Sequence, residues 1–91
     1  MNTVEALLPG LKFDLGITTD AYDERLAAHI QNAQKQIERE GVTISDSVSD
    51  DQLIIMYAAW TWRRRDSGEG MPRMLRYALN NRVFSEKMQN G

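Results

Sequence analysis

The spacing of apolar residues along the chain predicts an all-α protein. Apolar side chains recur every three or four positions over most of the 91 residues, which is the spacing of one helix face. The pattern predicts three main helices, over about residues 20–40, 50–66 and 72–81, and a short N-terminal helix at residues 3–8. We expect them to form one domain, residues 1–91, that is a small helical bundle with a C-terminal tail.

The first two predicted helices have recognisable ends. Pro9 is expected to interrupt the N-terminal helix, and a second turn can open there and end at Gly16, because proline suits the first position of a helix. In the next helix Thr19 or Asp20 can cap the start, and Gly41 marks the end. Its apolar stripe consists of Tyr22, Leu26, Ile30, Ala33 and Ile37.

The connection to the third helix ends in a capping signal. Residues 42–44 alternate between apolar and polar, which allows a short extended piece. Ser49, followed three residues later by Gln52, matches a capping box, and Val48 and Leu53 match the hydrophobic staple around it. The sequence therefore predicts a helix that is capped by Ser49.

The predicted helix over residues 50–66 is apolar on two opposite sides. One side carries Leu53, Met56, Tyr57 and Trp60, and the other carries Ile55, Ala59 and Trp62. A helix with two apolar sides is buried on both. We therefore expect a central helix with Trp60 in the core, or a helix that gives one side, with Ile55 and Trp62, to another subunit.

Three consecutive arginines, Arg63, Arg64 and Arg65, end this helix. They point in directions about 100° apart, so they cannot line one flat surface. Cations are favoured in a last helical turn, and arginine stems can pack along apolar neighbours. The arginines therefore either complete a charged helix end or also face DNA or an adjacent subunit.

The last predicted helix starts at Pro72 and ends near Asn81. Its apolar face consists of Met71, Met74, Leu75, Ala78 and Leu79. Arg73 and Arg76 lie on the opposite side and are further candidates for contact with DNA or a subunit. The pattern then breaks, so residues 82–91 are interpreted as a tail. Its apolar side chains, Val83, Phe84 and Met88, suggest a docking segment or one that folds back on its own domain.

Charge is distributed unevenly around a formal net charge of −2. Residues 1–60 carry four basic and ten acidic side chains, whereas residues 61–91 carry seven basic and three acidic ones. The molecule can therefore associate head to tail, or present its basic end to an acidic partner. Without a long apolar run or a signal-peptide pattern, the chain is expected to be soluble, without membrane contact.

The residues that usually perform catalysis are scarce. The chain has no cysteine and one histidine, and it lacks the glycine-rich phosphate loops and the hydrolase motifs. His29 lies at the edge of an apolar stripe, and we interpret it as a half-buried structural residue. The sequence therefore predicts a protein that is not an enzyme and uses no cofactor or metal.

Three segments together resemble a known family. "LGITTDAYDERL", "YAAWTWRRR" and "GMPRMLRYALNNRVFSEK" are similar to the small head-tail connector proteins of tailed bacteriophages and prophages, also called DNA-packaging or head-completion adaptors. The resemblance implies a small all-helical structural subunit of the virion head-tail junction, present in the host cytoplasm before assembly. It implies a ring, usually dodecameric, below the portal protein, with downstream head-completion or tail proteins as further partners. Double-stranded DNA would pass through the ring without sequence-specific contacts.

A second hypothesis is a small DNA-binding regulator. Residues 50–81 would then form a helix-turn-helix, with Arg73 and Arg76 near the start of the recognition helix, where side chains reach bases. The net negative charge is unfavourable for this hypothesis, since a dedicated DNA reader usually has a broad basic face.

Overall fold

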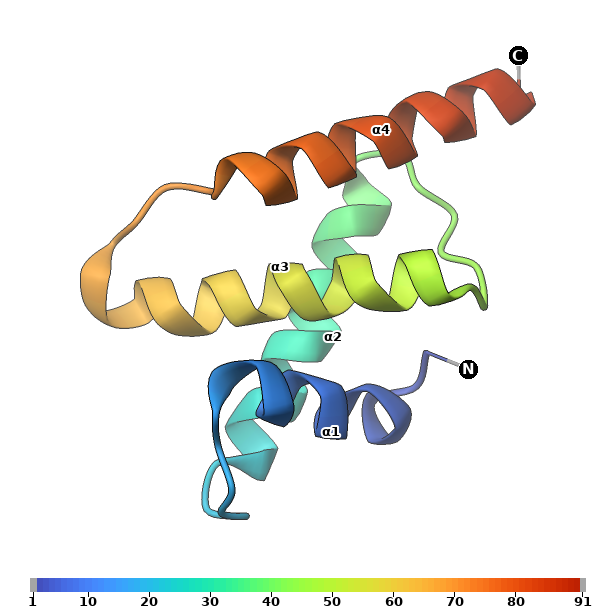
Figure 1. Ribbon diagram of the computed structural model, residues 1–91. Helices are drawn as coiled ribbons and strands as arrows, with labels where there is room; N and C mark the ends of the chain where they lie inside the picture. The colour runs from blue at the N-terminus through green and yellow to red at the C-terminus, as the bar shows by residue number, and fades with distance from the viewer. Residues whose placement is uncertain (1, 91) are drawn as a thin grey trace.

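Four α-helices make up the computed structural model, which describes residues 2–90 except for the side chains of Asp66, Gln89 and Asn90. The helices are α1 (Val4–Leu15), α2 (Asp23–Arg39), α3 (Val48–Ser67) and α4 (Arg73–Asn90). α3 lies in the middle, with α1 on one side, α4 on the other and α2 crossing behind it (Figure 1). The described residues contain no strand, so the predicted all-α fold is confirmed and residues 42–44 form none.

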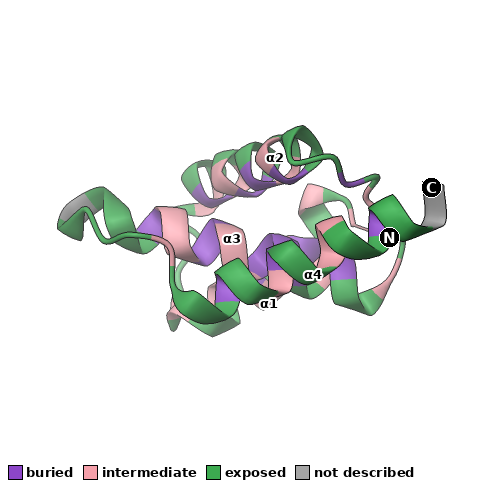
Figure 2. Ribbon diagram, turned by 90° about the horizontal axis from the view of Figure 1, so that it is seen from above, coloured by how far each residue is buried: buried purple, intermediate pink, exposed green. Residues whose placement is uncertain are grey.

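The core forms where α2 and α1 pack against α3. Figure 2 shows the buried residues of α2 on the side that faces α3. Four members of the predicted α2 stripe, Leu26, Ile30, Ala33 and Ile37, are fully buried as expected, whereas the fifth, Tyr22, precedes the helix and is exposed. Buried α3 residues face both sides of the helix: Leu53, Ile54, Ile55, Ala58, Ala59 and Trp62. The central position of α3 is therefore confirmed.

Two expectations about α3 side chains need correction. Ile55 and Trp62, expected at a subunit interface, are 7% and 8% exposed and belong to the core of the chain itself. Trp60, expected in the core, is only half-buried. Its indole Nε1 donates to the carbonyl oxygens of Glu69 and Gly70, so Trp60 holds the connecting loop against α3.

The interruption expected at Pro9 is wrong, because α1 continues through it. Pro9 has no backbone N–H, so the carbonyl of Glu5, four residues earlier, lacks its helical hydrogen bond. Both residues are exposed. Water can therefore solvate that carbonyl, while buried Leu7 and Leu11 hold the helix on the core. Gly10 allows a close approach to α3, since a Cβ at this position would lie 2.9 Å from Cδ1 of Ile55.

The predicted cap of α3 is also wrong. The helix begins at Val48, two residues earlier than predicted, and the hydroxyl of Ser47 accepts a hydrogen bond from the amide of Asp50. Ser49 is exposed, and Val48 is 77% exposed and forms no staple. The Asp50 carboxylate explains the shift, because its Oδ2 accepts from both the amide and the hydroxyl of Ser45 and thereby fixes the turn before the helix.

The start of α2 differs from the expectation as well. Tyr22 occupies the cap position, and its side chain makes no capping bond. Thr19 accepts instead from the amide of Ala21, and Asp20 forms an ion pair with Lys12 at 3.2 Å. Both predicted caps are therefore used in the loop that joins α1 to α2. The predicted end is close to the observed one, since α2 stops at Arg39, two residues before Gly41.

The predicted C-terminal tail is helical. α4 runs without a break to Asn90 and lies along α3 (Figure 1). Its inward stripe begins with the buried Leu75 and Leu79 and continues at helical spacing with Arg82 and buried Glu86. Polar side chains thus occupy inward positions, which is why the apolar pattern ends before the helix does.

Candidate functional site

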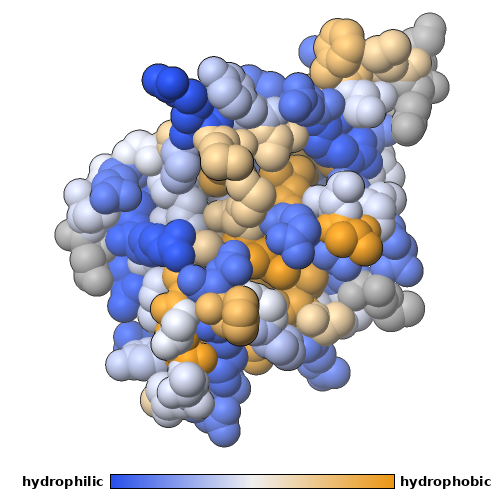
Figure 3. All heavy atoms as spheres, in the orientation of Figure 1, coloured by the Kyte–Doolittle hydropathy of each residue, from blue (hydrophilic) through white to orange (hydrophobic). Residues whose placement is uncertain are grey.

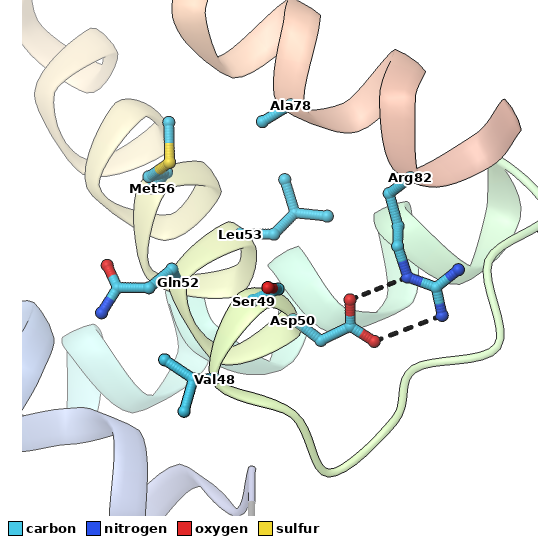
Figure 4. Close-up of a pocket in the computed structure, with 8 residues that line it drawn as sticks. All are labelled: Val48, Ser49, Asp50, Gln52, Leu53, Met56, Ala78 and Arg82. Atoms are coloured by element: carbon cyan, nitrogen blue, oxygen red, sulfur yellow. Dashed lines mark hydrogen bonds and ion pairs between the residues drawn. The ribbon is translucent and has the colours of Figure 1, made fainter. Parts of the chain in front are cut away.

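A buried polar cluster joins α4 to the start of α3. Arg82 Nε donates to Asp50 Oδ1 at 2.8 Å, and its Nη2 donates to Asp50 Oδ2 at 3.3 Å (Figure 4). The same Nη2 donates to the carbonyl of Thr43 at 2.8 Å. Glu86 Oε1 accepts a hydrogen bond from the amide of Thr43 at 2.6 Å and lies 3.4 Å from Arg82 Nη1. We call Asp50, Arg82 and Glu86, with Thr43 and Ser45, the polar cluster.

Electrostatics in the polar cluster favour the charged forms of Asp50 and Arg82. Burial alone would raise the pKa of Asp50, but hydrogen bonds from Arg82 and Ser45 outweigh it, so that pKa lies below its usual range. The groove beside the cluster, of about 330 Å³, is otherwise lined mainly by Val48, Ser49, Gln52, Leu53, Met56 and Ala78. Since the charged groups at this groove bind each other, the cluster is well suited to fastening helices and offers no reactive group.

A cluster of arginines surrounds the opposite end of the α3–α4 pair. Its members, which we call the arginine cluster, are Arg63, Arg64 and Arg65 in the last turns of α3 and Arg73 and Arg76 in the first turns of α4. All five are exposed. The short loop between the two helices brings both groups to the same end of the molecule (Figure 1). The structure therefore unites two groups that the sequence only suggested separately.

The three α3 arginines reach three different flanks, as their spacing predicts. Arg63 Nη2 donates to the carbonyl of Asp14 at the end of α1, at 3.3 Å. The guanidinium of Arg64 lies 4.9 Å from the ring centre of Trp60, and that of Arg65 lies 3.7 Å from the ring centre of Trp62. The guanidinium groups of Arg64 and Arg65 thus lie on aromatic rings, which orient these two charges.

Arg64 and Arg76 share one flank of the arginine cluster. Burial raises the pKa of Tyr57, nearby Glu40 raises it further, and Arg64 and Arg76 both oppose the increase. Both guanidinium groups therefore lie within electrostatic range of the same phenol. Such groups donate hydrogen bonds in a planar fork that fits phosphate or carboxylate oxygens, so this end can bind anionic groups.

The structural role expected for His29 is confirmed. Its Nδ1 lies 2.8 Å from the hydroxyl of Thr61, and its ring packs edge-on against Trp62 at 5.5 Å between ring centres. Burial lowers the pKa of His29, and the charge of Arg65 lowers it further. Among the described residues, no three histidine, cysteine or carboxylate side chains gather as a metal site would require.

The remaining candidate residues lie on the second half of α4. Val83 is half-buried against the core, whereas Phe84 and Met88 are 64% and 69% exposed. The sequence did not identify Asp50, Arg82 and Glu86 as a cluster. The available signal was the spacing of Arg82 and Glu86, which continues the Leu75–Leu79 stripe once the helix is extended.

Comparison with known proteins identifies no family. No protein-family model, no curated protein and no solved structure matches the chain. Within the described residues, no helix has the length and apolar character needed to cross a membrane.

Proposed function

We propose that the chain is a structural adaptor subunit of a tailed bacteriophage or prophage, which forms a ring with further copies at the head-tail junction. Its partners are the portal protein, the downstream head-completion or tail proteins, and double-stranded DNA that passes through the ring. The observation that carries the proposal is the arginine cluster, five exposed guanidinium groups at one end of a molecule with a formal net charge of −2.

The arrangement of these arginines favours contact without sequence reading. Arg63 reaches the end of α1 and Arg65 lies near His29 of α2, whereas Arg64 lies over Trp60 and shares the surroundings of Tyr57 with Arg76 of α4. Contacts with phosphates position a protein on DNA without reading its bases. Exposed arginines on different flanks of one helix end suit a channel wall, or a junction with an acidic neighbour, better than insertion into one groove.

The course of α3 and α4 favours the adaptor over the regulator. The two helices run in opposite directions along the same axis of the molecule (Figures 1 and 2). A helix-turn-helix pair instead crosses at about 90–120°, which allows the second helix to enter the major groove. The α3–α4 pair is an antiparallel hairpin, and α4 is fastened along its length to the rest of the domain.

The test replaces Arg63, Arg64 and Arg65 together with glutamine. The variant should remain folded, because the two cation–π contacts contribute only about 0.5–1 kcal/mol each at exposed sites. It should reduce the number of DNA-filled, tailed particles in cells that produce the complete virion. Arg25→Gln with Arg39→Gln, which removes exposed arginines from α2, is the matched control and should leave the particle yield unchanged.

A DNA titration separates the two functions. An adaptor should bind short duplexes weakly and without sequence preference. Normal particle yield from the triple variant, combined with loss of sequence-specific DNA binding, would refute the adaptor and establish the regulator. In that case the salt dependence should decrease by about one unit of slope for each lost phosphate contact.

A further inference from the structure

The outward face of α4 carries a heptad pattern of residues that are exposed within the described part of the chain. Met74, Tyr77, Asn81, Phe84 and Met88 follow the alternating three- and four-residue spacing of a helix-pairing seam. The four apolar members are 76%, 59%, 64% and 69% exposed, in chain order, and Asn81 is also exposed. Figure 3 shows apolar side chains protruding at the far end of α4. We call these five residues the α4 seam.

The charges along the α4 seam are of one sign. Arg73, Arg76 and Lys87 lie beside it and are exposed. The single carboxylate in the α4 sequence, Glu86, points inward into the polar cluster. Two α4 seams packed on each other would therefore bring cations together without an acid between them, which is unfavourable. The seam fits an acidic apolar surface instead.

The outer face of α1 is such a surface. It contains a hollow of about 520 Å³ lined by Leu8, Pro9, Phe13 and Ile17, and Phe13 is 87% exposed. Two carboxylates, Glu5 and Asp23, line it together with one cation, Lys12, and a third carboxylate, that of Asp20, pairs with Lys12. Lys12 is held by Asp20 at 3.2 Å and by Asp23 at 2.9 Å, so the rim as a whole is acidic. We call this surface the α1 hollow.

We propose that the α4 seam of one copy docks in the α1 hollow of a second copy of this chain. Protruding apolar side chains with a basic border meet an apolar hollow with an acidic border. α1 and α4 lie on opposite sides of α3 (Figure 1), so one subunit cannot close this contact on itself. The contact is heterologous, and its repetition produces a ring or an open filament. This inference rests on the proposed ring-forming function and names the surfaces that build the ring.

Disulfide trapping tests the contact, because the chain has no cysteine of its own. Pro9→Cys places a thiol in the α1 hollow, and Asn81→Cys places one at the centre of the α4 seam. Both positions are exposed. On oxidation, a mixture of the two variants should give several-fold more crosslinked dimer than either variant alone. A chain that carries both substitutions should give a ladder of oligomers, and both yields should decrease as salt screens the charges.

The matched control is Gln31→Cys on the exposed side of α2, mixed with Asn81→Cys. The proposal fails if this control mixture crosslinks as strongly as the Pro9→Cys mixture. It also fails if Asn81→Cys alone crosslinks as strongly, which would indicate α4–α4 pairing. Electron microscopy of the unmodified chain with its portal protein measures ring formation separately. If rings form without a crosslink between positions 9 and 81, the proposed contact is refuted and the proposed function stands. If the crosslink forms but no rings are seen, the contact is supported and the proposed ring is refuted.

Discussion

Removal of the Arg82 side chain should weaken the whole domain, because it takes away a cation that contacts two buried carboxylates. Asp50 and Glu86 have side chains only 3% and 9% exposed, and Arg82 contacts both. The substitution Arg82→Met keeps a long apolar stem of similar reach and removes the charge and the donors. It also leaves the carbonyl of Thr43 without the 2.8 Å hydrogen bond from Arg82.

The magnitude follows from the burial of the partners. Loss of one member of a buried ion pair typically costs about 3–5 kcal/mol. The Arg82 side chain is 19% exposed, and Ser45 still donates two hydrogen bonds to Asp50, so we expect a loss near the lower limit, about 3 kcal/mol. A domain of this size has a free energy of unfolding of about 5–14 kcal/mol. The variant should therefore fold but melt about 12–24 °C lower.

Urea titration of the free energy of unfolding at pH 7 measures this effect. Arg76→Met is the matched control, since Arg76 is exposed on the same helix, and its effect should stay within about 0.5 kcal/mol. Amide hydrogen exchange should also increase selectively in the second half of α4 in the Arg82 variant. A loss below about 1 kcal/mol, the usual limit for exposed ion pairs, would show that the polar cluster does not fasten α4.

Three further predictions concern the core, the α3 cap and pH. Trp62→Ala should cost about 3–5 kcal/mol in thermal melts, and the half-buried Trp60→Ala should cost less. In urea titration, Ser47→Ala should cost about 0.5–2 kcal/mol, whereas Ser49→Ala should be nearly neutral. The lowered pKa of His29 means that the fold disfavours its cation, so stability should fall as pH drops below about 6.5 toward the folded pKa. In a pH series of melts, His29→Gln should remove this decline.

The parts of the fold that the sequence predicted are those where one physical effect dominates. The α2 stripe follows directly from helical spacing, and its core members are buried as expected. The central position of α3 follows from its two apolar sides, because a helix of this kind needs neighbours on both. Helical spacing could not decide whether those neighbours belong to the same chain. The structure places Ile55 and Trp62 in the core of the chain itself.

The incorrect boundaries arise where a distant contact outweighs a local signal. Ser49 has a suitable capping pattern, yet Asp50 is drawn toward Arg82, which lies 32 residues away in the sequence, and the helix starts at Val48. Pro9 is tolerated inside α1 because it is exposed there while the opposite side of the helix is buried. Neither the contact of Asp50 with Arg82 nor the burial of the side of α1 opposite Pro9 can be inferred from residues within one helical turn.

The candidate site was predictable in its residues but not in its geometry. The fan of Arg63, Arg64 and Arg65 follows from helical rotation alone. Their aromatic supports, Trp60 and Trp62, lie three or four residues earlier on α3 itself. The approach of Arg76 depends instead on how α4 folds back along α3, which the sequence does not specify. Phe84 and Met88 were identified as apolar from the sequence. Because residues 82–91 were interpreted as a tail and not as a helix, the heptad spacing that connects them with Tyr77 was missed.

The polar cluster also fixes which face of α4 is turned outward, where the proposed assembly contact lies. An apolar residue at position 82 or 86 could bury against the core in several rotations of the helix, whereas the Arg82–Asp50 pair requires one geometry with two hydrogen bonds. That geometry turns the α4 seam outward over its full length. Because the same contacts keep the second half of α4 helical, a partner meets an ordered surface and loses less conformational entropy on binding. A polar cluster that fastens α4 to its own domain would therefore also orient the α4 seam for the proposed contact with a neighbouring subunit.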